Sequence, residues 1–392
     1  MGPDTSQPPR PNVTDVPTSS PSHDVNGTII NFPHIERVIP YRWHPESREI
    51  RAECTRWADR FLPNPEQFLP ETERSRREWE GSSVWHSGVS EAGLWSVVCY
   101  PDMDTERVLD IAKICVSLYW LDDLWHTNEP DKLGLLTEAA DVLVNGPPGP
   151  GASATAHVVW ESWHPVLARA SDAFRPRLIE TALRFIRGTA MEMVEFADPE
   201  EDPQWALTDQ TYLSHRLNNM AANFIWVMVE YCLGIDLAPE FAAYPPLRDN
   251  MHRLGCEHFC YVNDLLSYRK ECFDEEENVS YITRFLNQGV PLQEAFDRLA
   301  GMVEGIERRY LSAANQLRLV YAKQRDVEAW LTGMLTTNAG AFEYSYVTAR
   351  YQGRGASVED PHGPGLIPRR RTGPMLIPAG PNHRFGTAKS SG

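Results

Sequence analysis

Apolar residues recur at helical spacing along most of this chain, and no stretch shows the strict alternation of a half-buried strand. The first stripe follows His44 and includes Ile50, Cys54, Trp57 and Phe61. Further helices are expected over residues 65–79, 90–98, 154–169, 175–196, 245–274, 278–287, 291–322 and 324–350, with another near residue 209. The pattern therefore predicts an all-α fold, built as a single large helical bundle.

The most apolar helix is expected to begin at Asp104 and to run through residues 108–121. Because it is apolar nearly all round, it is predicted to lie at the centre of the bundle. It ends in Asp122 and Asp123, which are followed by His126 and Glu129. Two adjacent acids after such a run are costly to bury unless other charges or a metal ion compensate them. A loop that simply emerges into water is the alternative interpretation.

A second polar cluster lies on one face of the helix expected over residues 245–274. Asn263, Ser267 and Glu271 are spaced i, i+4, i+8, so they stack over two turns and present an amide oxygen, a hydroxyl and a carboxylate. These hard oxygen ligands suit Mg²⁺ or Mn²⁺ better than zinc. A solvated polar face is the simpler interpretation, but the apolar residues between positions 256 and 262 indicate a helix that enters a core.

The sequence Asn263-Asp264-x-x-Ser267-x-x-x-Glu271 resembles the N-D-x-x-S-x-x-x-E metal motif of class I terpene cyclases, and every fixed position is matched. The acid pair resembles the aspartate-rich motif of the same family, D-D-x-x-D or D-D-x-x-x-D/E. It departs from that motif because position 126 is His, position 127 is Thr and the next acid is Glu129. The resemblance covers nearly the whole region expected to be ordered. The members that the chain resembles are of the fungal and bacterial type.

This resemblance implies roles for individual residues. Arg216 resembles the diphosphate-sensing arginine, Asn219 the linker after it, and Met220 the residue whose carbonyl faces the departing group. Arg350 and Tyr351 resemble the terminal Arg-Tyr pair that hydrogen-bonds the diphosphate, and Lys270 adds a further cation. The implied metal ligands are Asp122, Asp123, Asn263, Ser267 and Glu271. The implied cofactor is Mg²⁺, bound as three ions, with Mn²⁺ as the alternative species. The candidate apolar walls around a carbocation are Tyr119, Phe224, Phe259 and Trp330, with Phe342 and Tyr346 as further possibilities.

The resemblance implies ionisation and cyclisation of an isoprenyl diphosphate, with farnesyl diphosphate giving a cyclic sesquiterpene and diphosphate. A monoterpene or diterpene substrate is an alternative. A prenyltransferase is another, although those enzymes carry two D-D-x-x-D motifs and the second motif here contains Asn, Ser and Glu. A non-catalytic helical binding protein is the third alternative, and the departure at His126 is what favours it.

Composition narrows the class of protein further. The chain has 392 residues, 42% of them hydrophobic, and a net charge of −17, which disfavours nucleic-acid or anionic-membrane binding. There are 7 Cys, and those at positions 115, 232, 256 and 260 are expected to be buried and reduced. Neither a signal-peptide core nor a run of 18 apolar residues is present, so a cytoplasmic enzyme is expected, with a homodimer possible.

Three segments are expected along the chain. Residues 1–29 are rich in Pro and Ser, and residues 353–392 are rich in Gly, Pro and Arg, so both are predicted to be disordered tails. Residues 30–352 are predicted to form the helical domain. The basic cluster Arg369–Arg371 is too short to indicate a nucleic-acid-binding protein.

Overall fold

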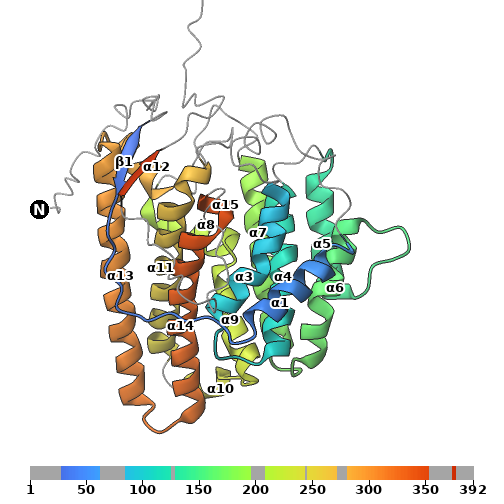
Figure 1. The fold of residues 1–392 in the computed structure, drawn as a ribbon. Coiled ribbons are helices and arrows are strands. Elements are labelled where there is room, and N and C mark those ends of the chain that lie inside the picture. Colours follow the sequence, from blue (N-terminus) through green and yellow to red (C-terminus); the bar gives the residue numbers. More distant parts are fainter. Residues whose placement is uncertain are drawn as a thin grey trace, which may run out of the picture.

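The computed structural model describes residues 28–61, 84–124, 129–195, 208–242, 245–271, 280–352 and 373–376. Within these ranges the chain is a bundle whose long helices run roughly parallel to one another (Figure 1). The predicted all-α architecture is thus confirmed. The helix expected over residues 65–79 lies outside the described residues, as do most of the two predicted tails.

The first half of the bundle surrounds the apolar helix that ends in the acid pair. Its helices are α1 (Ser47–Ala58), α3 (Val84–Cys99), α4 (Thr105–Asp123), α5 (Lys132–Asn145), α6 (Ala154–Arg169) and α7 (Arg175–Glu195). Asp104 caps α4 by accepting a hydrogen bond from the Arg107 amide, so this helix starts where the sequence predicts. Helix α5 was not predicted, although Leu136, Ala139 and Leu143 form a buried stripe at helical spacing.

The second half carries the oxygen-ligand triplet and the terminal Arg-Tyr pair. Its helices are α8 (Asp209–Asn219), α9 (Ala222–Leu233), α10 (Ala238–Phe241), α11 (Pro245–Glu271), α12 (Tyr281–Asn287), α13 (Leu292–Val320), α14 (Arg325–Val347) and α15 (Ala349–Gln352). The single helix predicted over 324–350 is interrupted at Thr348, whose φ of −66° and ψ of 133° are those of an extended residue. This break redirects the chain, so that Arg350 and Tyr351 belong to a separate turn.

Close packing between the two halves depends on a glycine. Gly340 of α14 lies so near α3 that a Cβ atom there would come within 2.0 Å of the Val98 carbonyl oxygen. Helix α4 packs against α3 and α6, and its residues Ile111, Ala112 and Ile114 are completely buried. The apolar helix that the sequence predicts to be central is therefore inside the bundle.

A two-stranded antiparallel ribbon joins segments from the two ends of the chain. Strand β1 (Ile29–Phe32) pairs with β2 (Gly373–Leu376), with Ile29 opposite Leu376 and Phe32 opposite Gly373. Both strands lie beside the start of α13, at the top of Figure 1. The prediction of no strand is therefore wrong for these eight positions, four of which fall in the predicted C-terminal tail. Strands of four residues are too short for an alternating pattern to be recognised.

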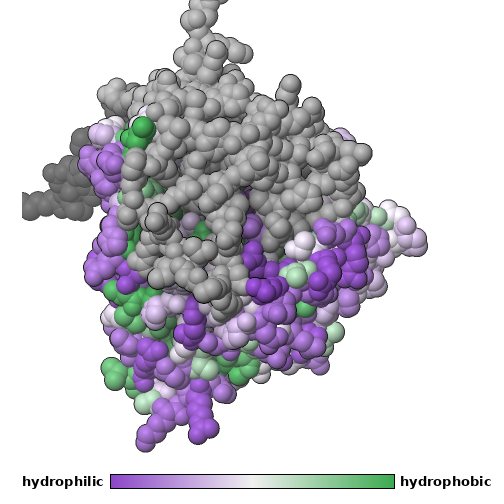
Figure 2. All heavy atoms as spheres, viewed as in Figure 1, coloured by the Kyte–Doolittle hydropathy of each residue, from purple (hydrophilic) through white to green (hydrophobic). Residues whose placement is uncertain are grey.

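The surface and the cysteines agree with the composition. Six cysteines in the described ranges are buried and form no disulfide, as expected for Cys115, Cys232, Cys256 and Cys260. Hydrophilic residues dominate the described surface in the view of Figure 2, with hydrophobic ones gathered in small patches. Among the helices that the structure describes, none combines the length and the apolar character needed to cross a bilayer.

Candidate active site

The acid pair at the end of α4 binds the arginine of the terminal Arg-Tyr pair. Arg350 donates to Asp123 from both terminal nitrogens, at 2.8 and 3.3 Å, and to Asp122 at 3.1 Å. Only 2% of the Arg350 side chain and 8% of the Asp123 side chain are exposed, whereas 48% of the Asp122 side chain is exposed. Asp123 is therefore buried in an ion pair, and Asp122 is the more exposed of the two acids.

Asn263 connects the oxygen-ligand triplet to two other predicted residues. Its Oδ1 accepts a hydrogen bond of 2.8 Å from Nη2 of Arg216, and its Nδ2 donates to the Tyr351 hydroxyl oxygen at 2.9 Å. Because Tyr351 directly follows Arg350, two consecutive residues of α15 reach both motifs. The structure thus brings together the acid pair, the triplet, Arg216 and the Arg-Tyr pair, as the sequence predicts.

The triplet residues follow one another along one face of α11. The Ser267 hydroxyl donates to a carboxylate oxygen of Glu271 and to the backbone carbonyl oxygen of Asn263, 2.7 Å away. In the described residues no three His, Cys, Asp or Glu side chains gather as a metal site would require. A hard cation held by amide, hydroxyl and carboxylate oxygens does not need such a cluster. The donor set therefore fits Mg²⁺ or Mn²⁺ in its chemistry.

The helix break predicted after Arg216 is present. Helix α8 ends at Asn219, and Ala221 adopts the left-handed conformation (φ 54°) before α9 begins. Asn219 accepts from Nη1 of Arg216 at 3.3 Å and donates to Glu192 of α7 at 2.8 Å. The Ala221 carbonyl accepts hydrogen bonds from the backbone amides of Phe224 and Ile225. Among the described residues, the backbone hydrogen bonds of turns, loops and helix caps include none to the Met220 carbonyl.

Burial and neighbouring charges set the electrostatics of this cluster. Burial alone would lower the pKa of Arg350, but the charges of Asp123 and Asp122 outweigh it and raise that pKa well above its ordinary value. Burial raises the pKa of Tyr351 to about 12, and the charges of Arg350, Glu271, Asp122 and Arg216 act on the same hydroxyl. Tyr351 thus keeps its hydroxyl proton at neutral pH, and its oxygen accepts the hydrogen bond from Asn263.

The aromatic candidates divide into two groups. Tyr119 and Phe259 are half-buried, one turn before Asp123 and Asn263 respectively, and the Arg350 guanidinium carbon lies 5.1 Å from the Tyr119 ring centroid. Phe224 is buried against Trp163. Trp330 packs on Phe241, about 26 Å along α14 from its last residue. The structure therefore places Trp330 away from the cluster.

The two further aromatic possibilities on α14 contact the N-terminal segment. The guanidinium carbon of Arg37 lies 3.7 Å from the Phe342 ring centroid, so that ring face is already occupied by a cation of the chain itself. Tyr346 packs edge-on against Phe32 of β1. Both rings therefore contact the N-terminal segment of the described chain.

Two residues near the site were not predicted to take part in it. Tyr344 is buried, accepts a hydrogen bond of 2.9 Å from the Tyr119 hydroxyl, and stacks edge-on with Tyr351. Its position six residues before Arg350 was visible in the sequence, but the break at Thr348 that turns Tyr351 toward it was not. The second residue is Asp264, which lies within the triplet motif and is completely buried.

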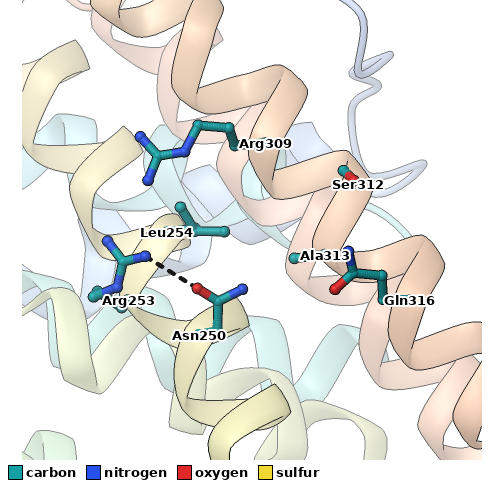
Figure 3. A pocket seen from close by; sticks show the side chains of 7 residues that line it. All are labelled: Asn250, Arg253, Leu254, Arg309, Ser312, Ala313 and Gln316. Carbon is teal, nitrogen blue, oxygen red and sulfur yellow. Dashed lines mark hydrogen bonds between the residues drawn. The ribbon is translucent and has the colours of Figure 1, made fainter.

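Some predicted features fall outside the described part or away from the site. His126 and the side chain of Lys270 lie outside the described residues, and Glu129 is described as half-buried in the loop before α5. A pocket of about 220 Å³ lies between α11 and α13 (Figure 3). It is lined by Asn250, Arg253, Leu254, Arg309, Ser312, Ala313 and Gln316. Asn250 is 13 residues before Asn263, about 20 Å along α11, so this pocket is separate from the candidate site.

Comparison with known proteins decides the family. The profile of terpene synthase family 2, described as its C-terminal metal-binding domain, matches residues 113–309, half of the chain. The chain belongs to terpene synthase family 2. It is a class I terpene cyclase, and the matched profile begins just before the acid pair and ends after the triplet.

Curated relatives of this terpene synthase are distant but extend over most of its length. It is 22% identical to (3S,6E)-nerolidol synthase of Selaginella moellendorffii over 331 residues, which cover 84% of this chain and 85% of that protein. It is also 22% identical to alpha-muurolene synthase of Coprinopsis cinerea, with coverages of 86% and 77%.

Solved structures of terpene synthases share its fold. The linalool/nerolidol synthase of Streptomyces clavuligerus superimposes with a TM-score of 0.63 at 17% identity, covering 80% of this chain and 98% of that one. Hedycaryol synthase gives the same TM-score at 21% identity, again with 80% and 98% covered. At these identities the likeness shows that the fold is shared.

Proposed function

We propose that this terpene synthase ionises farnesyl diphosphate in a reaction that depends on a divalent metal, and cyclises the resulting cation to a sesquiterpene. The observation that carries the proposal is the pair of contacts made by α15. Arg350 holds the acid pair while the adjacent Tyr351 holds Asn263, so both motifs face one small volume. Sesquiterpene synthases among the relatives support a substrate of this length.

Asp122, Asn263, Ser267 and Glu271 would hold the metal ions, of which Mg²⁺ is the proposed species and Mn²⁺ an alternative. Bound Mg²⁺ would stabilise the negative charge that develops on the diphosphate. Arg216, Arg350 and Tyr351 would donate hydrogen bonds to diphosphate oxygens, since Arg216 and Tyr351 contact Asn263 and Arg350 contacts the acid pair. Two opposite unit charges 4 Å apart attract by only ~1 kcal/mol in water but by ~4 kcal/mol at an effective dielectric of 20, so excluding water strengthens these contacts.

The reaction breaks the bond between the allylic carbon and the diphosphate oxygen, and the electron pair leaves with the oxygen. The allylic cation left behind needs neighbours that stabilise charge without attacking it. The half-buried rings of Tyr119 and Phe259 would serve as walls, each ring face contributing roughly 0.5–2 kcal/mol to a nearby cation. Tyr119 lies three residues before Asp122 and Phe259 four residues before Asn263, so each ring is about one helical turn from a proposed metal ligand.

The test is incubation of the purified full chain with geranyl, farnesyl and geranylgeranyl diphosphates, each with Mg²⁺ and with EDTA. Extracted products are analysed by mass spectrometry, and released diphosphate is measured in parallel. A cyclic C15 product from farnesyl diphosphate that requires Mg²⁺ is expected. Turnover of only the shorter or the longer substrate would contradict the sesquiterpene assignment, and turnover in EDTA would contradict the metal requirement.

A further inference from the structure

Asp264 is a carboxylate enclosed on all sides within the motif that supplies the proposed metal ligands. It is completely buried, and it lies one residue after Asn263, about 100° further round α11. It therefore faces α8 and α12, away from the row formed by Asn263, Ser267 and Glu271. A buried carboxylate is expensive unless several donors surround it, so its partners indicate what it does.

Three donors converge on Asp264. The Tyr212 hydroxyl donates to Oδ2 at 2.6 Å, the Tyr281 backbone amide donates to the same oxygen at 3.0 Å, and Nη2 of Arg216 lies 3.2 Å from Oδ1. Tyr212 belongs to α8 and Tyr281 is the first residue of α12. Two donors thus fix one carboxylate oxygen, which leaves the other oxygen in a defined position for the arginine.

The same nitrogen of Arg216 also donates to the proposed metal ligand. Nη2 lies 2.8 Å from Oδ1 of Asn263 and 3.2 Å from Oδ1 of Asp264, so the guanidinium spans two consecutive residues of α11. A divalent cation at Oδ1 of Asn263 would repel this guanidinium, because both are positive and close together. The negative charge of Asp264 opposes that repulsion and would keep Arg216 near the site when a metal ion binds.

We propose that Asp264 is a positioning residue, whose buried carboxylate holds the Arg216 guanidinium beside the metal ligand Asn263 so that this arginine can bind the diphosphate. The inference rests on the proposed function, because it requires a diphosphate at Arg216. It assigns Asp264 neither a metal-binding nor a proton-transfer role. Its effect is exerted through Arg216 alone, and this distinguishes it from a residue that merely stabilises the fold.

The first test measures the affinity of the full chain for inorganic diphosphate in the presence of Mg²⁺, by calorimetry. Asp264→Asn, Arg216→Gln and the double variant are compared with the wild type after circular dichroism has verified that each is folded. Each single change is expected to weaken binding roughly tenfold or more, because a charge-assisted contact is lost. The double variant is expected to bind no more weakly than Arg216→Gln, since the two residues act as one unit.

A second pair of variants covers the case in which Asp264→Asn does not fold. Tyr212→Phe removes one donor to Asp264 and leaves the carboxylate in place. Its matched control is Tyr231→Phe, because the Tyr231 hydroxyl also donates a hydrogen bond of 2.6 Å to a buried carboxylate, Asp110. Asp110 is 12 residues before Asp122 on α4, about 18 Å from the site. Both variants should lose similar stability, but only Tyr212→Phe should weaken diphosphate binding, by roughly threefold.

The outcomes separate this inference from the proposed function. If the wild type binds no diphosphate with Mg²⁺, the proposed function fails. If the wild type and its Arg216→Gln variant behave as expected but Asp264→Asn or Tyr212→Phe binds like wild type, Asp264 does not position the arginine. Losses that add in the Asp264→Asn, Arg216→Gln double variant would equally overturn the inference, because they would mean that the two residues act independently.

Discussion

At the scale of single residues, Asn263 has both ends of its side-chain amide engaged. Oδ1 accepts from Arg216 and Nδ2 donates to Tyr351, so this one side chain orients two diphosphate-binding candidates. Alanine cannot replace either contact and also removes the oxygen proposed to bind a metal ion. A second asparagine on the same helix, Asn250, serves as a control, because it lines the separate pocket between α11 and α13 shown in Figure 3.

Asn263→Ala is therefore expected to lower kcat/KM for the isoprenyl diphosphate by roughly a hundredfold or more, since a loss of about 3 kcal/mol corresponds to that factor. Asn250→Ala should leave kcat/KM within a factor of about two, because surface changes away from the site have small effects. Steady-state kinetics of the two variants provide the comparison. Equal activities of the two variants would refute the role given to Asn263.

The acid pair should separate stability from activity. Asp123 is buried with Arg350, so Asp123→Asn leaves a buried arginine partly uncompensated and is expected to cost about 3 kcal/mol of unfolding free energy. The Asp122 side chain is 48% exposed, so Asp122→Asn should cost less than about 1 kcal/mol. Activity should fall more in Asp122→Asn than in Asp123→Asn, because Asp122 is the proposed metal ligand. Urea unfolding and turnover, measured on both variants, would show whether these two orders differ.

His258 predicts a pH dependence of stability. It is completely buried on α11, and neither ring nitrogen has a hydrogen-bond partner among the described residues. Burial, with a smaller effect of Arg37, lowers its pKa to about 3, so the unfolded chain binds the extra proton between that pH and an ordinary histidine pKa of about 6.5. Stability therefore falls as the pH falls through this window, by about 1 kcal/mol from this residue between pH 7 and 5.5.

His258→Phe should remove that contribution from the pH dependence, as measured by urea unfolding at pH 7 and 5.5. The same replacement at His157, which is exposed on α6, is the control and should leave the difference between the two pH values unchanged. An unaltered pH dependence in His258→Phe would mean that this histidine is not held neutral in the folded state.

At the scale of elements, the break between α8 and α9 depends on a close approach to α7. A Cβ atom at Gly188 would come within 2.8 Å of the Asn219 backbone nitrogen, so any side chain there must displace the end of α8. Arg216 and Asn219 both belong to that last turn. The position of the proposed diphosphate-sensing arginine is thus set partly by a residue of another helix that carries no functional group.

Gly188→Ala is expected to destabilise the fold by about 1–3 kcal/mol and to raise the KM for the diphosphate substrate, because overpacking moves the Arg216 turn. Gly301→Ala on α13 is the control: no atom lies within 4 Å of a Cβ there, and alanine in an exposed helix should stabilise by about 0.5–1 kcal/mol. Thermal unfolding and kinetics would test both. A stable Gly188→Ala variant with unchanged KM would show that α7 does not set the position of this turn.

The sequence predicts the long helices because their hydrophobic stripes and caps are local signals. Helix α6 occupies the predicted residues 154–169, and α4 begins at its Asp104 cap. The break at Thr348 and the pairing of β1 with β2 depend on contacts between segments far apart in the chain, so periodicity does not reveal them. The triplet and the acid pair were predicted from helical spacing, and the roles of Arg216 and Arg350 from a resemblance. The hydrogen bonds from Tyr212 and Tyr281 to Asp264 required coordinates.

At the scale of the whole molecule, the residues of the candidate site lie toward one end of the bundle. The acid pair terminates α4, Arg216 lies in the last turn of α8, the triplet occupies the end of α11, and Arg350 follows α14. In Figure 1, α8, α12 and α15 lie toward the same end as the β1–β2 ribbon, while α10 lies at the opposite end. A net charge of −17 makes an uncompensated acidic cluster costly and favours binding of divalent cations.

The most direct test of the central claim is the anomalous scattering from a crystal of the full chain grown with Mn²⁺ and inorganic diphosphate. Manganese peaks are expected at about 2.1 Å from oxygen atoms of Asn263, Ser267 and Glu271, with a further peak at Asp122 and diphosphate oxygens in contact with Arg216 and Arg350. Manganese and diphosphate bound together at any other set of residues would contradict it.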